Sequence, residues 1–319
     1  MEKIFIVSIK YINFDPLPLN LYFMNSRRKF LQQSSAFLAA SVFAPRFLSA
    51  QTFTSRPVGI QLFTFFGKFD QDVKGNLQKI ADLGYTEIES AFSMLPGFYG
   101  MKGKEFKALN ADLGLNWVAH HVVGAPLKPR PGVDMSRFPK MLNLRDDAQQ
   151  AVDNAAEAGV KYLVCANTPI ETKDEVSDSV VTLQKTAELA KKAGLTFCYH
   201  NHDAEFKVVD GQKAFDVFSS QISADLLKFE LDLGWASKAG VDVVELFKQH
   251  PGRFPLCHIK DFDSEFKNIL PVGEGVINYK RIFDAAKSGG LEHFFVEHDF
   301  PKDAFESLRI SKKALDAIL

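Results

Sequence analysis

Eight short apolar runs alternate along this chain with longer amphipathic stretches, and this alternation constrains the fold more than any other feature. The order is typical of parallel strands joined by helices that pack outside the sheet. The expected strands are 58–63, 86–90, 116–121, 162–166, 196–200, 227–232, 254–260 and 293–297, and the clearest helical patterns are 144–158 and 176–193. Eight such units predict an α/β fold of one domain, a single (β/α)8 TIM barrel.

Glycine ends the helical pattern before five of the strands, at Gly84, Gly114, Gly159, Gly194 and Gly290. Glycine at this place lets a helix end in the left-handed conformation. A doubly wound open sheet is the alternative architecture. The segment after the first strand, however, lacks the Gly-x-Gly-x-x-Gly turn that holds nucleotide phosphates in such sheets, so the sequence favours the barrel.

The long irregular stretches 93–104, 124–143 and 261–278 all follow strands. In a β/α barrel the loops after strands surround the mouth where active sites form. We therefore expect these stretches to decide substrate specificity.

The first fifty residues have the pattern of a targeting signal. Residues 26–32 read Ser-Arg-Arg-Lys-Phe-Leu-Gln, an apolar run covers 34–43, and Leu-Ser-Ala ends at Ala50. This resembles a twin-arginine signal, which exports folded proteins, and predicts cleavage near Ala50 and a periplasmic or exported barrel over 51–319. A short membrane anchor or a chance arginine pair is the alternative. Met24 lies where such signals begin, so either Met1 or Met24 is the start.

Composition excludes several partners. The formal net charge of the 319 residues is −1, and no basic run is longer than Arg27 to Lys29, so nucleic acid and, once the signal is cleaved, membranes are not expected partners. The three cysteines lie inside apolar runs and predict buried free thiols. The oligomeric state stays open, with a homodimer among the options.

Ionisable residues gather where the expected strands end. They are Glu87, Glu89, His120, His121, His200, His202, Asp232, His258 and Glu297. The fifth to eighth strands each offer one residue of a kind that binds first-row metals. The sequence thus predicts a metal ring of His200, Asp232, His258 and Glu297, with His202 as a rival of His200.

Further residues near these strand ends suit a substrate. Lys260 is two positions after His258, hence on the same strand face, and could reach a substrate oxygen. Asp261 follows it, and the run Val-Gly-Glu-Gly places Glu274 between two glycines that allow a tight backbone over a ligand. A solvated lysine and a plain turn are the alternatives.

As a series, these residues resemble the sugar phosphate isomerase/epimerase family of xylose isomerase-like barrels. The resemblance covers 58–319 and rests on Gly-Ile-Gln-Leu-Phe at 59–63, Leu-Gly-Tyr at 83–85 before Glu89, Tyr-His-Asn-His at 199–202, Leu-Asp-Leu-Gly-Trp at 231–235, His-Ile-Lys-Asp at 258–261, Val-Gly-Glu-Gly at 272–275 and Val-Glu-His at 296–298. It implies a divalent metal held by His200, Asp232, His258 and Glu297, and a small carbohydrate substrate.

Two positions depart from this family. Its epimerases usually have glutamate where His200 stands and often histidine where Trp235 stands. Two carboxylates and two imidazoles favour Mn, Fe, Co or Zn over Mg. The change also removes one acid/base group that a two-carboxylate epimerase would use.

The leading functional hypothesis is a metal-dependent isomerase or epimerase that removes a proton next to a sugar carbonyl, with the metal stabilising the enediolate. Glu297 is the expected base, and His120 and Lys260 are further catalytic candidates. Glu89, His202, Trp235, Asp261 and Glu274 are candidate substrate contacts. The alternatives are a lyase or hydrolase of 3-keto-glycosides, a non-catalytic periplasmic sugar-binding barrel and, least favoured, an endonuclease.

Overall fold

Eight parallel strands close into a barrel in the computed structural model, which describes residues 56–128 and 141–319. They are β1 (Val58–Gln61), β2 (Glu87–Ser90), β3 (Asn116–Val122), β4 (Tyr162–Cys165), β5 (Thr196–His200), β8 (Leu227–Asp232), β9 (Leu256–Ile259) and β12 (His293–Val296). Their order is β1-β12-β9-β8-β5-β4-β3-β2, and β12 pairs with β1 to close the ring. The predicted (β/α)8 barrel is therefore confirmed.

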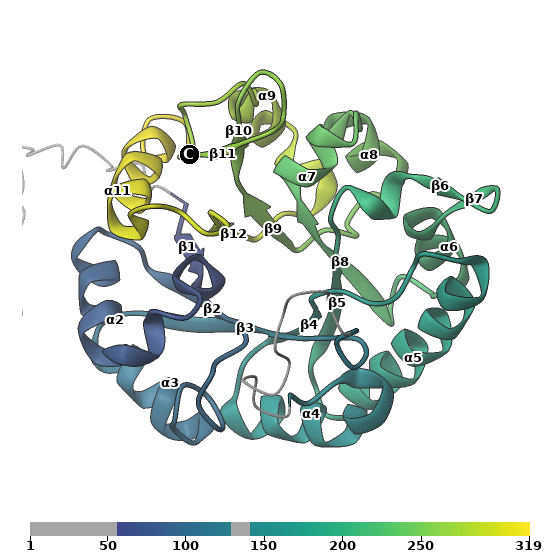
Figure 1. Ribbon diagram of the computed structural model, residues 1–319, viewed down its shortest axis with the longest axis horizontal. Coiled ribbons are helices and arrows are strands. Elements are labelled where there is room, and N and C mark those ends of the chain that lie inside the picture. Colours follow the sequence, from purple (N-terminus) through teal and green to yellow (C-terminus); the bar gives the residue numbers. More distant parts are fainter. Residues whose placement is uncertain (1–55, 129–140) are drawn as a thin grey trace, which may run out of the picture. The chain divides into compact units, whose positions relative to one another are not determined.

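Helices surround the strands on the outside, as the view down the barrel shows (Figure 1). They are α2 (Val73–Asp82), α3 (Gly103–Asp112), α4 (Leu144–Ala158), α5 (Lys173–Lys192), α6 (Ala214–Gln221), α7 (Leu233–Lys238), α8 (Val243–Gln249), α9 (Tyr279–Asp284), α10 (Ala286–Gly289) and α11 (Ala304–Leu315). All five predicted helix-ending glycines have φ between 71° and 86°, which confirms their left-handed conformation.

Two small hairpins lie outside the barrel: β6 (Val208–Val209) with β7 (Gln212–Lys213), and β10 (Asp261–Phe262) with β11 (Ile269–Leu270). The second hairpin occupies part of the stretch 261–278, for which the sequence predicted irregular structure. The first strand also ends earlier than expected. The Gln61 side chain accepts a hydrogen bond from Phe63 N at 3.0 Å and starts the 3-10 turn η1 (Leu62–Phe65).

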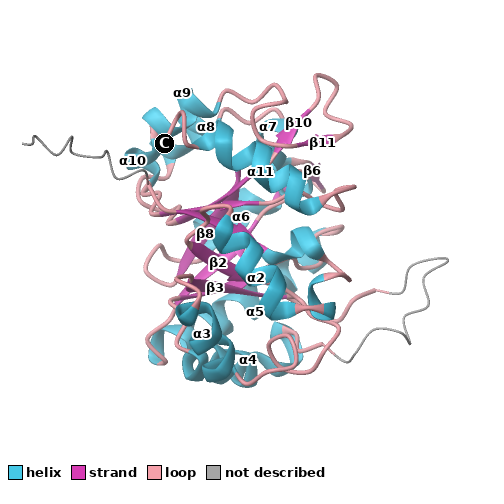
Figure 2. Ribbon diagram, turned by 90° about the vertical axis from the view of Figure 1, so that its left-hand side faces the viewer, coloured by secondary structure: helices cyan, strands magenta, loops and turns pink. Residues whose placement is uncertain are grey.

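The core has two layers. Inside the barrel, seven buried side chains fill the lower part: Val118, Ala119, Tyr162, Val164, Cys198, Leu256 and Phe295. A larger apolar layer lies between the strands and the helices, and the side view shows helices on both sides of the strands (Figure 2). The three cysteines are buried and free, as predicted. Toward the carboxyl ends of the strands the inward-facing residues become polar, and there the site forms.

The expected export signal and its cleavage point near Ala50 lie outside the described residues. Within the part that is described, no helix has both the length and the apolar character needed to cross a membrane.

Candidate functional site

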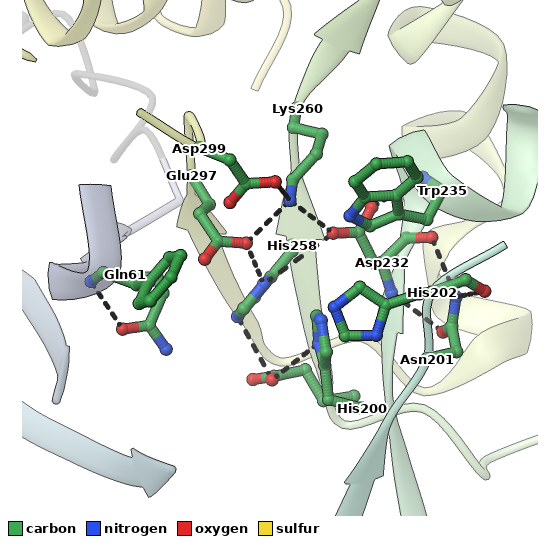
Figure 3. A network of polar contacts seen from close by, with 12 residues as sticks. Gln61, His200, Asn201, His202, Asp232, Trp235, His258, Lys260, Glu297 and Asp299 are labelled. Atoms are coloured by element: carbon green, nitrogen blue, oxygen red, sulfur yellow. Dashed lines mark hydrogen bonds and ion pairs between the residues drawn. The ribbon is translucent and has the colours of Figure 1, made fainter. Parts of the chain in front are cut away.

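Four side chains from four neighbouring strands form a buried ring at the carboxyl end of the barrel. They are His200 on β5, Asp232 on β8, His258 on β9 and Glu297 directly after β12, and each offers a ligand atom within 4.8 Å of the others. His258 Nδ1 is 2.9 Å from Glu297 Oε2 and 3.9 Å from Asp232 Oδ2 (Figure 3). The structure thus brings together the four residues that the sequence predicted as metal ligands.

A second group of polar side chains adjoins the ring, and its carboxylates, Glu89 and Glu230, are completely buried. His121 on β3 and Glu230 on β8 combine with His200 and His258 into another group whose ligand atoms lie within 4.8 Å of one another. His258 Nε2 is 2.6 Å from Glu89 Oε2 and 3.1 Å from Glu230 Oε2, and His121 Nε2 is 2.6 Å from Glu230 Oε2. The two nitrogens of His258 therefore face the two groups, and the carboxylates of Glu89 and Glu230 orient its ring.

Glu230 was missed in the sequence, and His121 was noted there at a strand end but was not chosen as a site residue. Glu230 is two positions before Asp232 on β8, so strand alternation places both carboxylates on the inner face. This spacing was the signal that could have found it. For β3, the sequence offered His120 and His121 side by side, and the structure places His121 in the cluster.

Charges within the cluster shift the pKa values of its members. Burial alone would lower the pKa of His121, but Glu89 and Glu230 raise it to about 10. Burial would raise the pKa of Glu297, but Lys260 and His258 hold it well below its usual range. Burial and the nearby His258 lower the pKa of His200. Glu297 is therefore ionised and His200 neutral, which are forms that bind metal. Burial, by contrast, raises the pKa of Asp232, and although burial alone would lower the pKa of His258, Glu230 and Glu297 raise it. Metal binding to the ring would therefore release protons.

Lys260 lies buried beside the ring, with 1% of its surface exposed. Its ammonium group is 2.8 Å from Asp299 Oδ2, 2.9 Å from Glu297 Oε2 and 3.2 Å from Asp232 Oδ2. The three carboxylates raise the pKa of Lys260 despite the opposite effect of burial, which keeps it charged. Its contacts in the structure are thus with protein carboxylates, while the predicted contact with a substrate oxygen stays a prediction.

His202 follows His200 by two residues, just beyond the end of β5. Strand β5 ends at His200, and the two rings meet edge to face with centroids 4.9 Å apart, while the His202 ring lies 5.9 Å from that of Trp235. The backbone N–H of His202 donates to Glu205 Oε2 at 2.8 Å, which fixes the turn. Because His200 belongs to both ligand groups and His202 to neither among the described residues, the geometry favours His200 as the ligand.

Asn201 ties this turn to the next strand. Its Oδ1 accepts from the backbone N–H of Asp232 at 3.1 Å, and Asp232 Oδ1 in turn accepts from Trp235 N at 2.8 Å, capping α7. The Asn201 side chain thus joins the end of β5 to the end of β8, where His200 and Asp232 project.

The remaining predicted residues lie at different places. His120 faces away from the cluster, with Nδ1 2.8 Å from Ser90 Oγ and its ring against Phe98, although it reaches the cavity wall. Burial and the neighbouring His121 lower the pKa of His120 to about 3. Its predicted catalytic role stays a prediction.

Asp261 and Glu274 lie apart from the cluster. The buried Asp261 carboxylate accepts hydrogen bonds from the backbone N–H groups of Gly273, Gly275 and Ile277. Glu274 is exposed on the turn that these bonds hold. Neither belongs to the described residues that line the cavity, so the structure shows an organising contact for Asp261 and no contact of Glu274 with the site.

A cavity of about 1670 Å³ opens above the ring. The polar residues that line it near the ring are His121, His200, His202, Glu297 and Asp299, and Trp235 lies beside them. Among the ring residues, Glu297 and His200 thus reach the cavity, while Asp232 and His258 are completely buried beneath them.

The donor atoms fit a divalent metal. Glu230 Oε1 is buried and has no hydrogen-bond partner among the described residues, while His200 Nδ1 is 3.2 Å from Glu230 Oε2 and Asp232 Oδ2 forms the ion pair with Lys260. Unpaired buried donors and acceptors are unfavourable unless a further partner binds them. Two imidazoles and two carboxylates form a ligand set that suits Zn, Mn, Fe or Co.

Comparison with known proteins agrees with the architecture. The family described as xylose isomerase-like TIM barrel matches residues 77–318. A sugar phosphate isomerase/epimerase from Parabacteroides distasonis is 27% identical, with a TM-score of 0.69 over 84% of this chain and 96% of that chain. The structure described as the IOLI protein with a binding zinc atom has 17% identity and a TM-score of 0.62, over 82% of this chain and 97% of that one, and shows the shared fold.

Among curated proteins, inosose dehydratase of Lacticaseibacillus casei is 25% identical over 172 residues, which are 47% of this chain. The chain spans 57% of the length of that relative. The printed names of two of these relatives are those of enzymes, a sugar phosphate isomerase/epimerase and an inosose dehydratase. Since the family match covers most of the barrel and the closed fold agrees with it, the chain belongs to the xylose isomerase-like TIM barrel family.

Proposed function

We propose that this protein is a metal-dependent enzyme that removes a proton from a carbon next to the carbonyl of a sugar or sugar derivative. The observation that carries the proposal is the ring of His200, Asp232, His258 and Glu297 at the floor of a cavity. Neighbours named as sugar isomerases, epimerases and inosose dehydratases support it, because such reactions share removal of a proton next to a carbonyl.

The four ring residues would hold the metal. A divalent ion bound there supplies a Lewis acid that polarises a carbonyl oxygen. The buried carboxylates of Glu89 and Glu230 would keep the His258 ring oriented, as partners of metal-bound histidines commonly do, and His121 contacts Glu230.

Glu297 is the group placed to take the proton. It lines the cavity, and its Oε2 contacts the His258 ring and the Lys260 ammonium. His202 also lines the cavity, just beyond the end of β5, and is placed to return a proton to the substrate. Base and acid thus come from opposite sides of the ring, from the ends of β12 and β5.

Elimination from a 3-keto-glycoside is the second candidate, and one observation favours it. Of the two ring carboxylates, only Glu297 is among the described residues that line the cavity. Two-carboxylate epimerisation needs two such acid/base groups in contact with the substrate, whereas elimination needs one carboxylate as the base. In elimination the proton goes to Glu297, the C–H electron pair forms the carbon–carbon double bond, and the β-oxygen leaves with a proton from His202.

Exchange in deuterated water tests the proposal. Protein purified without chelator is incubated with a ketose, a keto-inositol and a 3-keto-glucoside, and deuterium incorporation or release of the leaving group is followed by NMR. We expect metal-dependent exchange or release with at least one substrate. Glu297→Gln should lower the rate by about 100-fold or more, because general base catalysis contributes that much.

Glu157→Gln is the matched control, since Glu157 is exposed on α4. The proposal fails if the protein carries no stoichiometric divalent metal and catalyses neither exchange nor release. A sugar-binding barrel without catalysis would then be the better interpretation. Release of the leaving group without exchange on free ketoses would favour elimination over isomerisation.

A further inference from the structure

The cavity above the ring has an apolar side that the proposed chemistry does not use. Four phenylalanines line it, and we call them the phenylalanine wall: Phe63 and Phe66 after β1, Phe92 after β2 and Phe300 after β12. Their rings form one connected surface, with centroid distances of 5.2 Å for Phe63–Phe66, 5.5 Å for Phe63–Phe300 and 5.7 Å for Phe66–Phe92.

Phe300 combines two features that are unfavourable in a protein without a ligand. It is 70% exposed, and its φ of 54° lies in the left-handed region, which a bulky side chain rarely adopts. Tyr99 has a similar φ of 55°, but it is buried and its hydroxyl is hydrogen-bonded to Ala91. Burial and the hydrogen bonds of its hydroxyl can offset the unfavourable φ of Tyr99. The exposed Phe300 has no such compensation from burial. Strained residues of this kind concentrate at ligand sites.

The wall has a fixed position relative to the ring. Phe300 is three residues after Glu297, and the intervening His298 donates its backbone N–H to Thr64 Oγ1 at 3.2 Å. Phe63 donates its backbone N–H to Gln61 Oε1, and Gln61 Nε2 donates to Glu89 Oε2 at 2.9 Å. A ligand over Glu297 would therefore have the wall beside it.

The chemistry of the wall selects its ligand. Phenylalanine rings bring apolar area and stacking but have no hydrogen-bonding group, whereas the hydroxyls of a bare sugar require such groups. We propose that the wall is a subsite for an apolar substituent, so that the substrate is a keto-sugar that carries an apolar group such as an aryl aglycone. This proposal rests on the proposed function, since it places the sugar part over the ring.

Binding of two glucosides without a keto group tests the subsite separately from catalysis. Affinities of metal-loaded protein for phenyl β-glucoside and methyl β-glucoside are measured by calorimetry. We expect the phenyl compound to bind about tenfold or more tightly, in the range that an apolar pocket gives. Phe300→Ser should remove most of this preference while leaving the affinity for the methyl compound unchanged.

Phe266→Ser is the matched control. Phe266 has the same φ of 54° but packs against Phe262 and is not among the described cavity-lining residues, so the preference should persist. Equal affinities for the two glucosides, no binding of either, or an unchanged preference in Phe300→Ser would overturn the proposal. Metal content and deuterium exchange in the same sample report on the proposed function: metal-free, inactive protein that still prefers the phenyl compound would keep the subsite and reject that function.

Discussion

Lys260 places a charged ammonium group in a buried position between Asp232, Glu297 and Asp299. Removing one partner from a buried ionic cluster is strongly destabilising, because the other charges stay without compensation. We predict that Lys260→Met lowers the free energy of unfolding of chelator-treated protein by about 3 kcal/mol. Urea unfolding followed by circular dichroism measures this change.

Metal should reduce that effect, since a bound cation would compensate the same carboxylates. Lys280→Met is the control, because Lys280 is exposed and pairs with Asp284 one helical turn away, so its loss should change stability little. An equal, small effect of both substitutions would show that the buried cluster does not depend on Lys260.

Much of the site could be predicted from residue types at strand ends. His200, Asp232, His258 and Glu297 meet as expected, because parallel strands in a barrel bring their carboxyl ends to one mouth. The choice between His120 and His121 could not be made in the same way. The pairing of β2 with β3 shifts between Ile88 and Glu89, and such an irregularity changes which of two adjacent side chains points inward.

At the scale of elements, Asp261 organises the turn between β11 and α9. Its buried carboxylate accepts three backbone N–H groups from Gly273, Gly275 and Ile277 at 3.0–3.1 Å. Asp261→Ala would leave these donors without their partner. We predict a loss of about 3 kcal/mol in the free energy of unfolding, since several charge-assisted hydrogen bonds are lost together. Chemical denaturation measures it.

Asp263→Ala provides the comparison within the same hairpin. Asp263 also accepts backbone N–H groups, from Lys267 and Asn268, but these bonds are exposed to solvent. Water can replace its carboxylate, so the loss should be clearly smaller than for Asp261→Ala. Similar losses for the two variants would contradict the organising role of Asp261.

Element boundaries were less predictable than element order. The eight strands appear in the expected order, while β1 ends at Gln61 and β9 ends at Ile259. Hairpin β10–β11 was missed because its strands have only two residues each, too few for alternation to become visible. The buried role of Asp261 was equally hidden, since its partners are backbone groups twelve or more residues away.

At the scale of the whole molecule, we propose that residues 24–50 direct export of the folded barrel. In the full chain, replacing both Arg27 and Arg28 by lysine should keep the protein inside the cell, because the arginine pair carries the signal. Cell fractionation with immunodetection measures the distribution. Arg46→Lys, outside the pair, should be exported normally, and export of the double variant would contradict the proposal.

The pairing of β1 with β12 has a consequence for how the chain reaches its native state. Val58 pairs with Phe294, so one edge of the first strand has no partner until almost all of the barrel has been synthesised. Contacts between such distant residues slow folding, because a long loop must close before they form. Until then β1 exposes an open strand edge that can pair with other chains. Substitutions that delay formation of β12 should therefore increase aggregation during synthesis more than they lower the stability of the finished barrel.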